Sequence, residues 1–180
     1  MNHNDHVRLL QNGVPHTGGV WADLGAGEGA FTLALAELIG PSGTIYAVDR
    51  DGRALQSLEK TMRRSFPQIT LHTIQADFTR PLALPPLDGV VMANSLHFVA
   101  QKGPVLQQVK GYLKEADGRL PDGRLLIVEY NSDQSNHWVP YPFSYQTWVK
   151  LAQQTGFRHT EQLATYPSRF LHEIYAALSR

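Results

Sequence analysis

The stretch WADLGAGEGAF, residues 21–31, decides the fold of this 180-residue chain. Its apolar beginning is typical of a buried strand, which we expect over residues 19–24, and glycines follow at positions 25, 27 and 29. Glycines let the backbone approach a ligand closely, and the amphipathic helix expected after them begins with unpaired amide groups. The stretch therefore predicts a strand, a nucleotide-binding turn and a helix.

Strands and helices alternate along the following hundred residues. Further strands are expected at residues 44–49, 68–77, 87–95 and 123–130, and the helices between them are marked by apolar residues at three- and four-residue spacing. Two Asp-Gly turns are expected just before the fifth strand, at 117–118 and 122–123. This alternation predicts an α/β fold with a doubly wound, mostly parallel sheet, helices on both faces and ligands at the carboxyl ends of the strands.

The last third of the chain departs from this alternation. After a helix expected at about 144–155, residues 157–167 and 169–178 read as two strands joined by a short turn, which must pair antiparallel. The sheet then has seven strands and ends in a hairpin with a reversed strand. We expect residues 1–180 to form a single domain, with residues 1–18 as a short N-terminal lid or arm.

Composition and charge exclude several classes of function. Lys plus Arg and Asp plus Glu are 16 each, so the formal net charge of zero does not indicate nucleic acid or an anionic membrane as partner. The absence of cysteine excludes disulfides, thiolate zinc sites and thiol nucleophiles. The first residues lack a secretory signal and no apolar run reaches membrane-spanning length, which predicts a cytoplasmic protein.

Acidic residues at strand ends distinguish between two kinds of nucleotide. A dinucleotide site could use Ala30 as the third small residue and Asp49 for the ribose. That interpretation leaves Asp23, two residues before the first glycine, and Asp77, which closes the third strand, without a role. Three aspartates along one edge suit a cofactor with an amino acid cation, a ribose diol and an adenine better.

At this point the chain resembles the class I S-adenosylmethionine-dependent methyltransferases over nearly its whole length. ADLGAGEGAF looks like the first cofactor motif of that family, IYAVDRD the second, QADF the third and GRLLIVEY the fifth-strand motif. Each motif is loose alone, whereas four in order at suitable spacing are fairly specific. The family closes its seven-stranded sheet with one reversed strand, and the terminal hairpin fits that feature.

The resemblance assigns the glycine turn to the methionine part of S-adenosylmethionine. It implies that the backbone of Gly25, Ala26 and Gly27 contacts this part, and that Asp23 orders the loop, partly through water. Asn94, at the end of the fourth strand, would face the sulfonium region.

The resemblance assigns the second and third strand ends to the nucleoside. Asp49 would accept both ribose hydroxyls, with Arg50 beside it in the cofactor site. Asp77 would accept from the adenine amino group, with Phe78 next to the ring. An aspartate at a strand end can instead cap a helix or a turn, and that alternative stays open for Asp49 and Asp77.

Methyl transfer from a sulfonium needs a general base only if the acceptor must lose a proton. His97, just past the fourth strand, is the best candidate base, because imidazole titrates near neutrality. The alternative is that His97 only hydrogen-bonds a loop carbonyl. No metal site is expected, since Asn94 stands where a metal-dependent catechol-type pattern would have further acids.

The aromatic stretch at residues 131–148 is expected to border the acceptor pocket. Its rings could enclose a flat or cationic acceptor and exclude water: Trp138, Tyr141, Phe143 and Tyr145. We take Tyr141 as a second candidate catalytic residue and His137 as a second candidate base. The alternative is an aromatic seam that packs the loop and Trp148 against the sheet.

The sequence therefore predicts an S-adenosylmethionine-dependent methyltransferase of unidentified acceptor, with a small molecule slightly favoured over nucleic acid. Residues 1–18 are too few for a large helical cap, so the pocket would be shallow, completed by a second subunit in a homodimer, or open to a macromolecular side chain. Two alternatives stay open. One is a protein that binds S-adenosylmethionine without catalysis, and the other is a nicotinamide-dependent oxidoreductase, supported by the glycine turn and Asp49.

Overall fold

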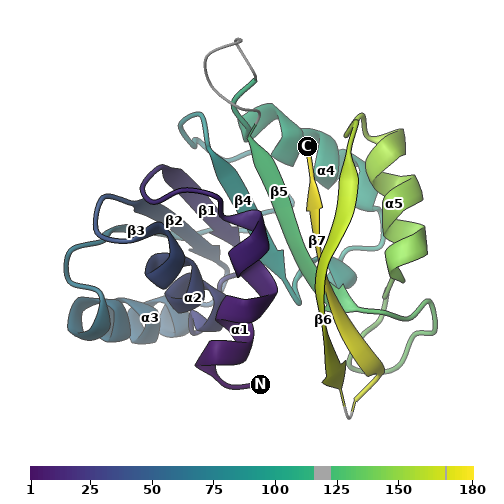
Figure 1. The fold of residues 1–180 in the computed structure, drawn as a ribbon, viewed down its shortest axis with the longest axis horizontal. Coiled ribbons are helices and arrows are strands. Elements are labelled where there is room, and N and C mark those ends of the chain that lie inside the picture. Colours follow the sequence, from purple (N-terminus) through teal and green to yellow (C-terminus); the bar gives the residue numbers. More distant parts are fainter. Residues whose placement is uncertain (116–122, 169) are drawn as a thin grey trace.

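A computed structural model describes residues 1–115, 123–168 and 170–180 of the chain (Figure 1). Its strands form one seven-stranded sheet in the order β3-β2-β1-β4-β5-β7-β6. The strands are β1 (Val20–Leu24), β2 (Thr44–Asp49), β3 (Thr70–Gln75), β4 (Gly89–Ala93), β5 (Arg124–Tyr130), β6 (Thr160–Ser168) and β7 (His172–Ser179). The predicted turn at 117–118 and the aspartate of the turn at 122–123 lie outside the described residues.

Five helices accompany the strands within the described residues. They are α1 (His3–Leu10), α2 (Ala30–Ile39), α3 (Gly52–Ser65), α4 (Lys102–Tyr112) and α5 (Tyr145–Gln154), with short 3-10 turns η1 (Gln11–Gly13) and η2 (Leu96–Phe98). None of the helices in these ranges is both long and apolar enough to span a membrane.

The pairing of the strands confirms the predicted sheet. β1 pairs in parallel with both β2 and β4, and β3 and β5 continue the parallel sheet on either side. β7 is antiparallel to both of its neighbours, β5 and β6, and is therefore the one reversed strand. The central strands are buried along nearly their whole length, because helices cover both faces.

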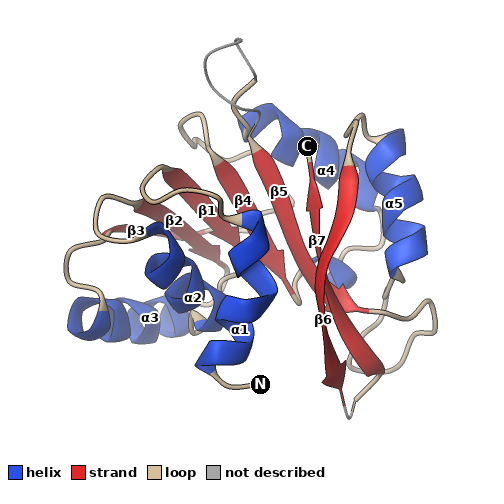
Figure 2. Cartoon of the chain, viewed as in Figure 1, coloured by secondary structure: helices blue, strands red, loops and turns tan. Residues whose placement is uncertain are grey.

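Two hydrophobic cores lie on opposite faces of the sheet. One joins the sheet to α1, α2 and α3 through Leu9, Leu35 and Leu58, and the other joins it to α4 and α5 through Leu106 and Trp148. Figure 2 shows these helices flanking the sheet, with α1 lying between α2 and β6. Because β1 to β5 run parallel, their carboxyl ends lie together at one edge of this packed layer.

The N-terminal arm is a helix, which the sequence pattern did not predict. Asn2 and Asp5 form a capping box, in which the Asp5 amide donates to the Asn2 side chain over 3.1 Å and the Asn2 amide donates to the Asp5 carboxylate over 2.8 Å. Leu9 and Leu10 are buried against the rest of the core. A single buried leucine pair at the end of a polar segment is too short for a periodic signal.

Gly29 allows α2 to begin close to α3. It is the N-cap of α2 with φ of 91°, and a Cβ built on it would lie 2.1 Å from Leu58 Cδ1. Any side chain here would meet both a left-handed backbone and the buried leucine of α3.

We therefore expect Gly29→Ala to lower the free energy of unfolding by about 1–3 kcal/mol, because the strained φ and the overpacked Leu58 act together. The matched control is Gly111→Ala in α4, where an added Cβ meets nothing within 4 Å. The control should be neutral or slightly stabilising, since alanine favours helix. Urea unfolding midpoints measure both, and equal midpoints for the two variants would contradict this account.

Candidate active site

A cavity of about 410 Å³ opens at the carboxyl ends of the parallel strands. It lies beside the ends of β1 and β4, the neighbouring strands where the strand order reverses, which is where open α/β sheets bind ligands. The loops after β1 to β4 supply its lining: Gly25, Asp49, Arg50, Asp77, Phe78, Thr79, Asn94, Ser95, Phe98 and Val99.

Most residues predicted to bind the cofactor surround this cavity. Six of them line it: Gly25, Asp49, Arg50, Asp77, Phe78 and Asn94. Asp23 and Ala26 line an adjoining cavity of about 230 Å³, which Gly25 and Asn94 also border. The structure thus brings the predicted residues of four strand ends together, whereas Thr79, Ser95, Phe98 and Val99 were not predicted.

The glycine turn is held tightly between β2 and the loop after β4. Gly25 has φ of 85°, and a Cβ on it would lie 2.4 Å from the Cβ of Ser95. The Ser95 hydroxyl donates to the Leu24 carbonyl over 2.7 Å, and the amides of Gly25 and Ala26 both donate to the Val48 carbonyl. The turn therefore has room for backbone alone at this point.

Asp49 ties the glycine turn to the end of β2. Its Oδ2 accepts from the Gly27 amide over 2.8 Å, and its Oδ1 accepts from the Asp51 amide over 2.9 Å. Each carboxylate oxygen can accept a further hydrogen bond, so these contacts leave Asp49 able to bind a ligand.

Asp77 caps a turn and lines the cavity at the same time. Its Oδ1 accepts from the Thr79 hydroxyl over 2.7 Å and from the Thr79 amide over 2.9 Å. These hydrogen bonds, the side-chain one first, hold the pKa of Asp77 below its usual value. The capping role and a ligand-binding role are therefore compatible.

Asn94 combines a left-handed backbone conformation with an unpaired buried oxygen in the cavity wall. It is one of two non-glycine residues with positive φ in the described part of the chain, at 51°, and its Oδ1 is buried with no hydrogen-bond partner among the described residues. A buried polar atom without a partner costs about 1–3 kcal/mol. A site that keeps both the strain and the unpaired oxygen is suited to a ligand that donates a hydrogen bond.

Asp23 is fully buried at the end of β1. Its Oδ2 accepts from the Thr32 hydroxyl of α2 over 2.6 Å. Burial raises the pKa of Asp23 to about 7; the Thr32 hydrogen bond opposes this shift and the charge of Asp49 adds to it.

His97 is buried in η2 and paired with a residue that the sequence analysis did not single out. Its Nδ1 lies 2.6 Å from Oε2 of Glu129, which is at the end of β5 and fully buried. Glu129 Oε1 accepts from the backbone amides of Leu96 and His97 over 3.0 and 3.2 Å. An ionisable residue inside the apolar run of β5 was the signal available for finding Glu129.

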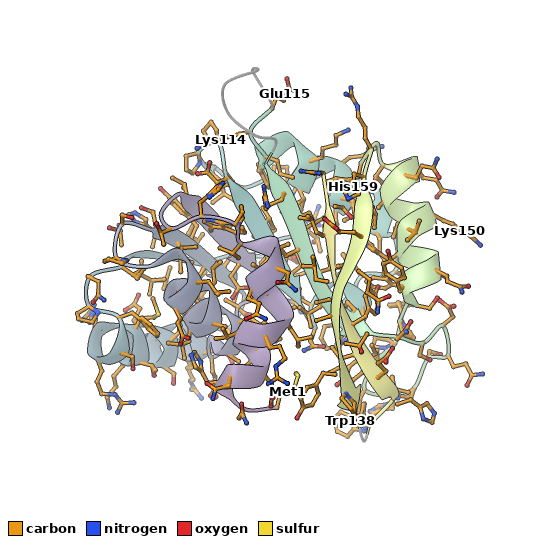
Figure 3. The ribbon with its side chains drawn as sticks, in the orientation of Figure 1. Met1, Lys114, Glu115, Trp138, Lys150 and His159 are labelled. Carbon is orange, nitrogen blue, oxygen red and sulfur yellow. The ribbon has the colours of Figure 1, made fainter. Side chains whose placement is uncertain are left out.

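The aromatic loop divides into a buried part and an exposed part. Phe143 and Trp148 pack in the core, as the seam alternative expects, whereas Trp138 is 68% exposed and Tyr141 is 48% exposed. Tyr141 does not line the cavity, but its amide donates to the His97 carbonyl over 3.0 Å. Figure 3 shows Trp138 at the same end of the molecule as Met1, and His137 beside it is exposed.

Lys102 fastens this loop to the cavity wall. Its Nζ donates to the carbonyls of Val99 and Tyr141 over 2.8 and 2.9 Å, and it lies over the rings of Tyr141 and Phe143. Burial lowers the pKa of Lys102, while the nearby charge of Glu129 opposes the shift.

Solved structures share this fold. A methyltransferase dependent on S-adenosylmethionine from Aquifex aeolicus superposes with a TM-score of 0.72 at 16% identity, covering 97% of this chain and 88% of that one. An arsenic(III) S-adenosylmethionine methyltransferase from Chlamydomonas reinhardtii gives a TM-score of 0.71 at 17% identity, with 91% and 62% of the two chains covered. At these identities the likeness concerns the fold.

Sequence comparison relates the chain to methyltransferases with differing acceptors. A ribosomal RNA small subunit methyltransferase H from Acidobacterium capsulatum is 29% identical over 67% of this chain and 43% of its own length. A demethylmenaquinone methyltransferase from Lactobacillus johnsonii is 31% identical over 59% and 42%. The chain thus spans less than half the length of these two relatives.

The family model described as a methyltransferase domain matches residues 22–120, more than half of the chain. This match covers the glycine turn and the ends of β1 to β4, and the chain belongs to the methyltransferase domain family.

Proposed function

We propose that this protein is an S-adenosylmethionine-dependent methyltransferase, with a small molecule as the favoured acceptor. One observation carries the proposal. Asp49, Asp77 and Asn94, from three different strand ends, line a single cavity together with Gly25, where the turn has room for backbone alone. The family to which the chain belongs supports the same conclusion.

The residues of the cavity fit the parts of S-adenosylmethionine. The unpaired Oδ1 of Asn94 and the backbone of the glycine turn suit the cationic methionine end. Asp49 offers two carboxylate oxygens to a ribose diol, and Asp77 next to Phe78 offers an acceptor beside an apolar ring to adenine. Arg50 also lines the cavity, and its charge contributes to the lowered pKa of Asp77.

When bound, S-adenosylmethionine supplies a methyl group already activated on a sulfonium. The protein then has to orient the acceptor, exclude water and receive any proton that the acceptor loses. Phe98 and Val99 give the cavity an apolar wall, and His97 lies in the same short segment. Tyr141 and Lys102 hold the neighbouring loop against this segment.

A small-molecule acceptor is supported by charge and by exposed rings. The formal net charge of zero provides no general attraction for a phosphate backbone. Phe98, Trp138 and Tyr141 are large apolar side chains that remain exposed, 48–68% each, on loops that follow β4 and β5. Relatives named for ribosomal RNA and for demethylmenaquinone match the chain almost equally well, so these matches do not indicate which acceptor this chain uses.

Calorimetric titration with S-adenosylhomocysteine, the demethylated product, tests the proposal directly. We expect binding in the micromolar range, equivalent to about 8 kcal/mol, and none for NAD or NADP. Binding of a nicotinamide nucleotide instead would make the protein an oxidoreductase. If the protein binds S-adenosylhomocysteine but transfers no methyl group to any acceptor, it is a binding protein without catalytic activity.

Replacing Asp49 by alanine should weaken S-adenosylhomocysteine binding by about 2–4 kcal/mol, because two ribose hydroxyls lose a charged acceptor. The matched control is Asp51→Ser, which removes a neighbouring negative charge and keeps a side chain that can cap α3, as Asp51 does. The control should bind within about twofold of the wild type, since Asp51 does not line the cavity. An unchanged dissociation constant for Asp49→Ala would remove Asp49 from the site.

The raised pKa of Asp23 predicts a stability that depends on pH. The folded state holds the Asp23 proton up to about pH 7, whereas the unfolded chain releases it near 3.8, so stability should fall as pH rises through this window. Asp23→Asn removes the titration. Its free energy of unfolding relative to the wild type should improve from about pH 5 to pH 8, by at most about 3 kcal/mol. Urea unfolding at both pH values measures the change, and parallel pH profiles would show that Asp23 titrates normally.

A further inference from the structure

Glu129 and His97 form a buried pair that the cofactor site does not require. The two residues are 0% and 3% exposed, and they come from β5 and from the turn after β4. Neither lines the cavity that we assign to S-adenosylmethionine. Burying a carboxylate is costly unless hydrogen bonds compensate it, and a packed apolar pair could occupy this space at lower cost.

The hydrogen bonds of Glu129 determine where the imidazole proton lies. Oε1 accepts from the two backbone amides of Leu96 and His97, so the carboxylate cannot rotate without losing both. Oε2 then faces Nδ1 of His97 at 2.6 Å. Because a carboxylate only accepts hydrogen bonds, Nδ1 carries the proton, and the lone pair of a neutral imidazole is on Nε2.

Nε2 of His97 remains available for a further contact. No described residue hydrogen-bonds to it. In the described part of the chain, the buried side-chain atoms that lack a hydrogen-bond partner are Asn94 Oδ1 and Trp148 Nε1, and Nε2 of His97 is not one of them. Nε2 therefore keeps contact with solvent. The centroid of the imidazole ring lies 4.3 Å from the ring centroid of Phe98, which lines the cavity, and 6.0 Å from the ring centroid of Tyr130.

We propose that Glu129 is a positioning residue that holds His97 as the base of the reaction. The presence of a base implies that the substrate atom to be methylated carries a hydrogen before transfer. A hydroxyl or an acidic C–H is such a group, whereas a tertiary amine or a thioether needs no base. This inference rests on the proposed methyltransferase function and names the class of its acceptor.

The proton balance is simple. The O–H or C–H bond of the acceptor breaks, its hydrogen moves to Nε2 as a proton, and the electron pair stays on the acceptor atom, where it becomes the bond to the methyl carbon. The imidazolium that forms is paired with the Glu129 carboxylate. One proton is released to solvent from Nε2 for each methyl group transferred.

Nitrogen-15 NMR of the histidine rings tests the inference without an acceptor. His97→Asn identifies the His97 signals among those of eight histidines by their loss. At mildly alkaline pH, wild-type His97 should show a protonated, pyrrole-type Nδ1 and an unprotonated, pyridine-type Nε2. A proton on Nε2, or on both nitrogens, would overturn the inference, and this reading needs no variant of Glu129.

Glu129→Gln should reverse the pattern. Its Oε1 must still accept from the Leu96 and His97 amides, which leaves the NH2 group facing Nδ1 as a donor. The proton then moves to Nε2, whose chemical shift changes from pyridine type to pyrrole type. A folded Glu129→Gln protein with unchanged His97 signals would show that Glu129 does not position the ring.

The matched control is Glu173→Gln on β7, whose carboxylate accepts from the Asn131 side chain over 2.8 Å. It removes the same charge elsewhere on the sheet and should leave the His97 signals unchanged. Titration of the wild type with S-adenosylhomocysteine separates the two proposals. Failure to bind it would refute the methyltransferase function, whereas the tautomer of His97 is measured independently.

Discussion

The contact between Gly25 and Ser95 holds the site together. It joins the turn after β1 to the loop after β4, and a methyl group on Gly25 would lie 2.4 Å from the Ser95 Cβ. The hydrogen bond from Ser95 to the Leu24 carbonyl closes the same contact from the other side. Because β1 and β4 are neighbours in space but far apart in sequence, this contact fixes the two parts of the proposed cofactor site against each other.

The buried ionisable residues concentrate at this edge of the sheet. In the described part of the chain, the buried acidic and imidazole side chains are Asp23, His97 and Glu129, and all three lie at or just after the ends of β1, β4 and β5; the phenol of Tyr175 on β7 is the other buried titratable group. Asp23 avoids a buried charge by a raised pKa, whereas Glu129 has three donors around it. The molecule thus places costly groups where ligand and proton chemistry are proposed, and keeps the rest of its core apolar.

The alternation of strands and helices could be predicted from sequence because buried parallel strands are continuous apolar runs. The proximity of the acidic residues Asp49 and Asp77 could be predicted as well, because the carboxyl ends of parallel strands lie at the same edge of a sheet. Helix α1 was missed because its capping box and two buried leucines give too little periodicity. The pair of His97 and Glu129 was missed for a different reason. It is a contact across 32 residues of sequence, and only the register of β4 and β5 brings the two side chains together.

The proposed cofactor contacts and the residues suited to an acceptor lie mostly on different segments and meet at Phe98. The former follow β1, β2, β3 and β4, where backbone geometry and strand-end acids leave little freedom. Among the exposed large apolar side chains of the described residues, Phe98 borders the proposed cofactor cavity and Met1 the cavity beside it, whereas Trp138, Tyr141 and Phe170 line neither. They come from the N-terminus, the loops after β4 and β5, and the turn between β6 and β7. Loops of this kind can change without disturbing the sheet. The residues suited to an acceptor can therefore vary while the glycine turn is kept, and His97, which Glu129 holds, contacts them through Phe98, whose ring centroid lies 4.3 Å from its own.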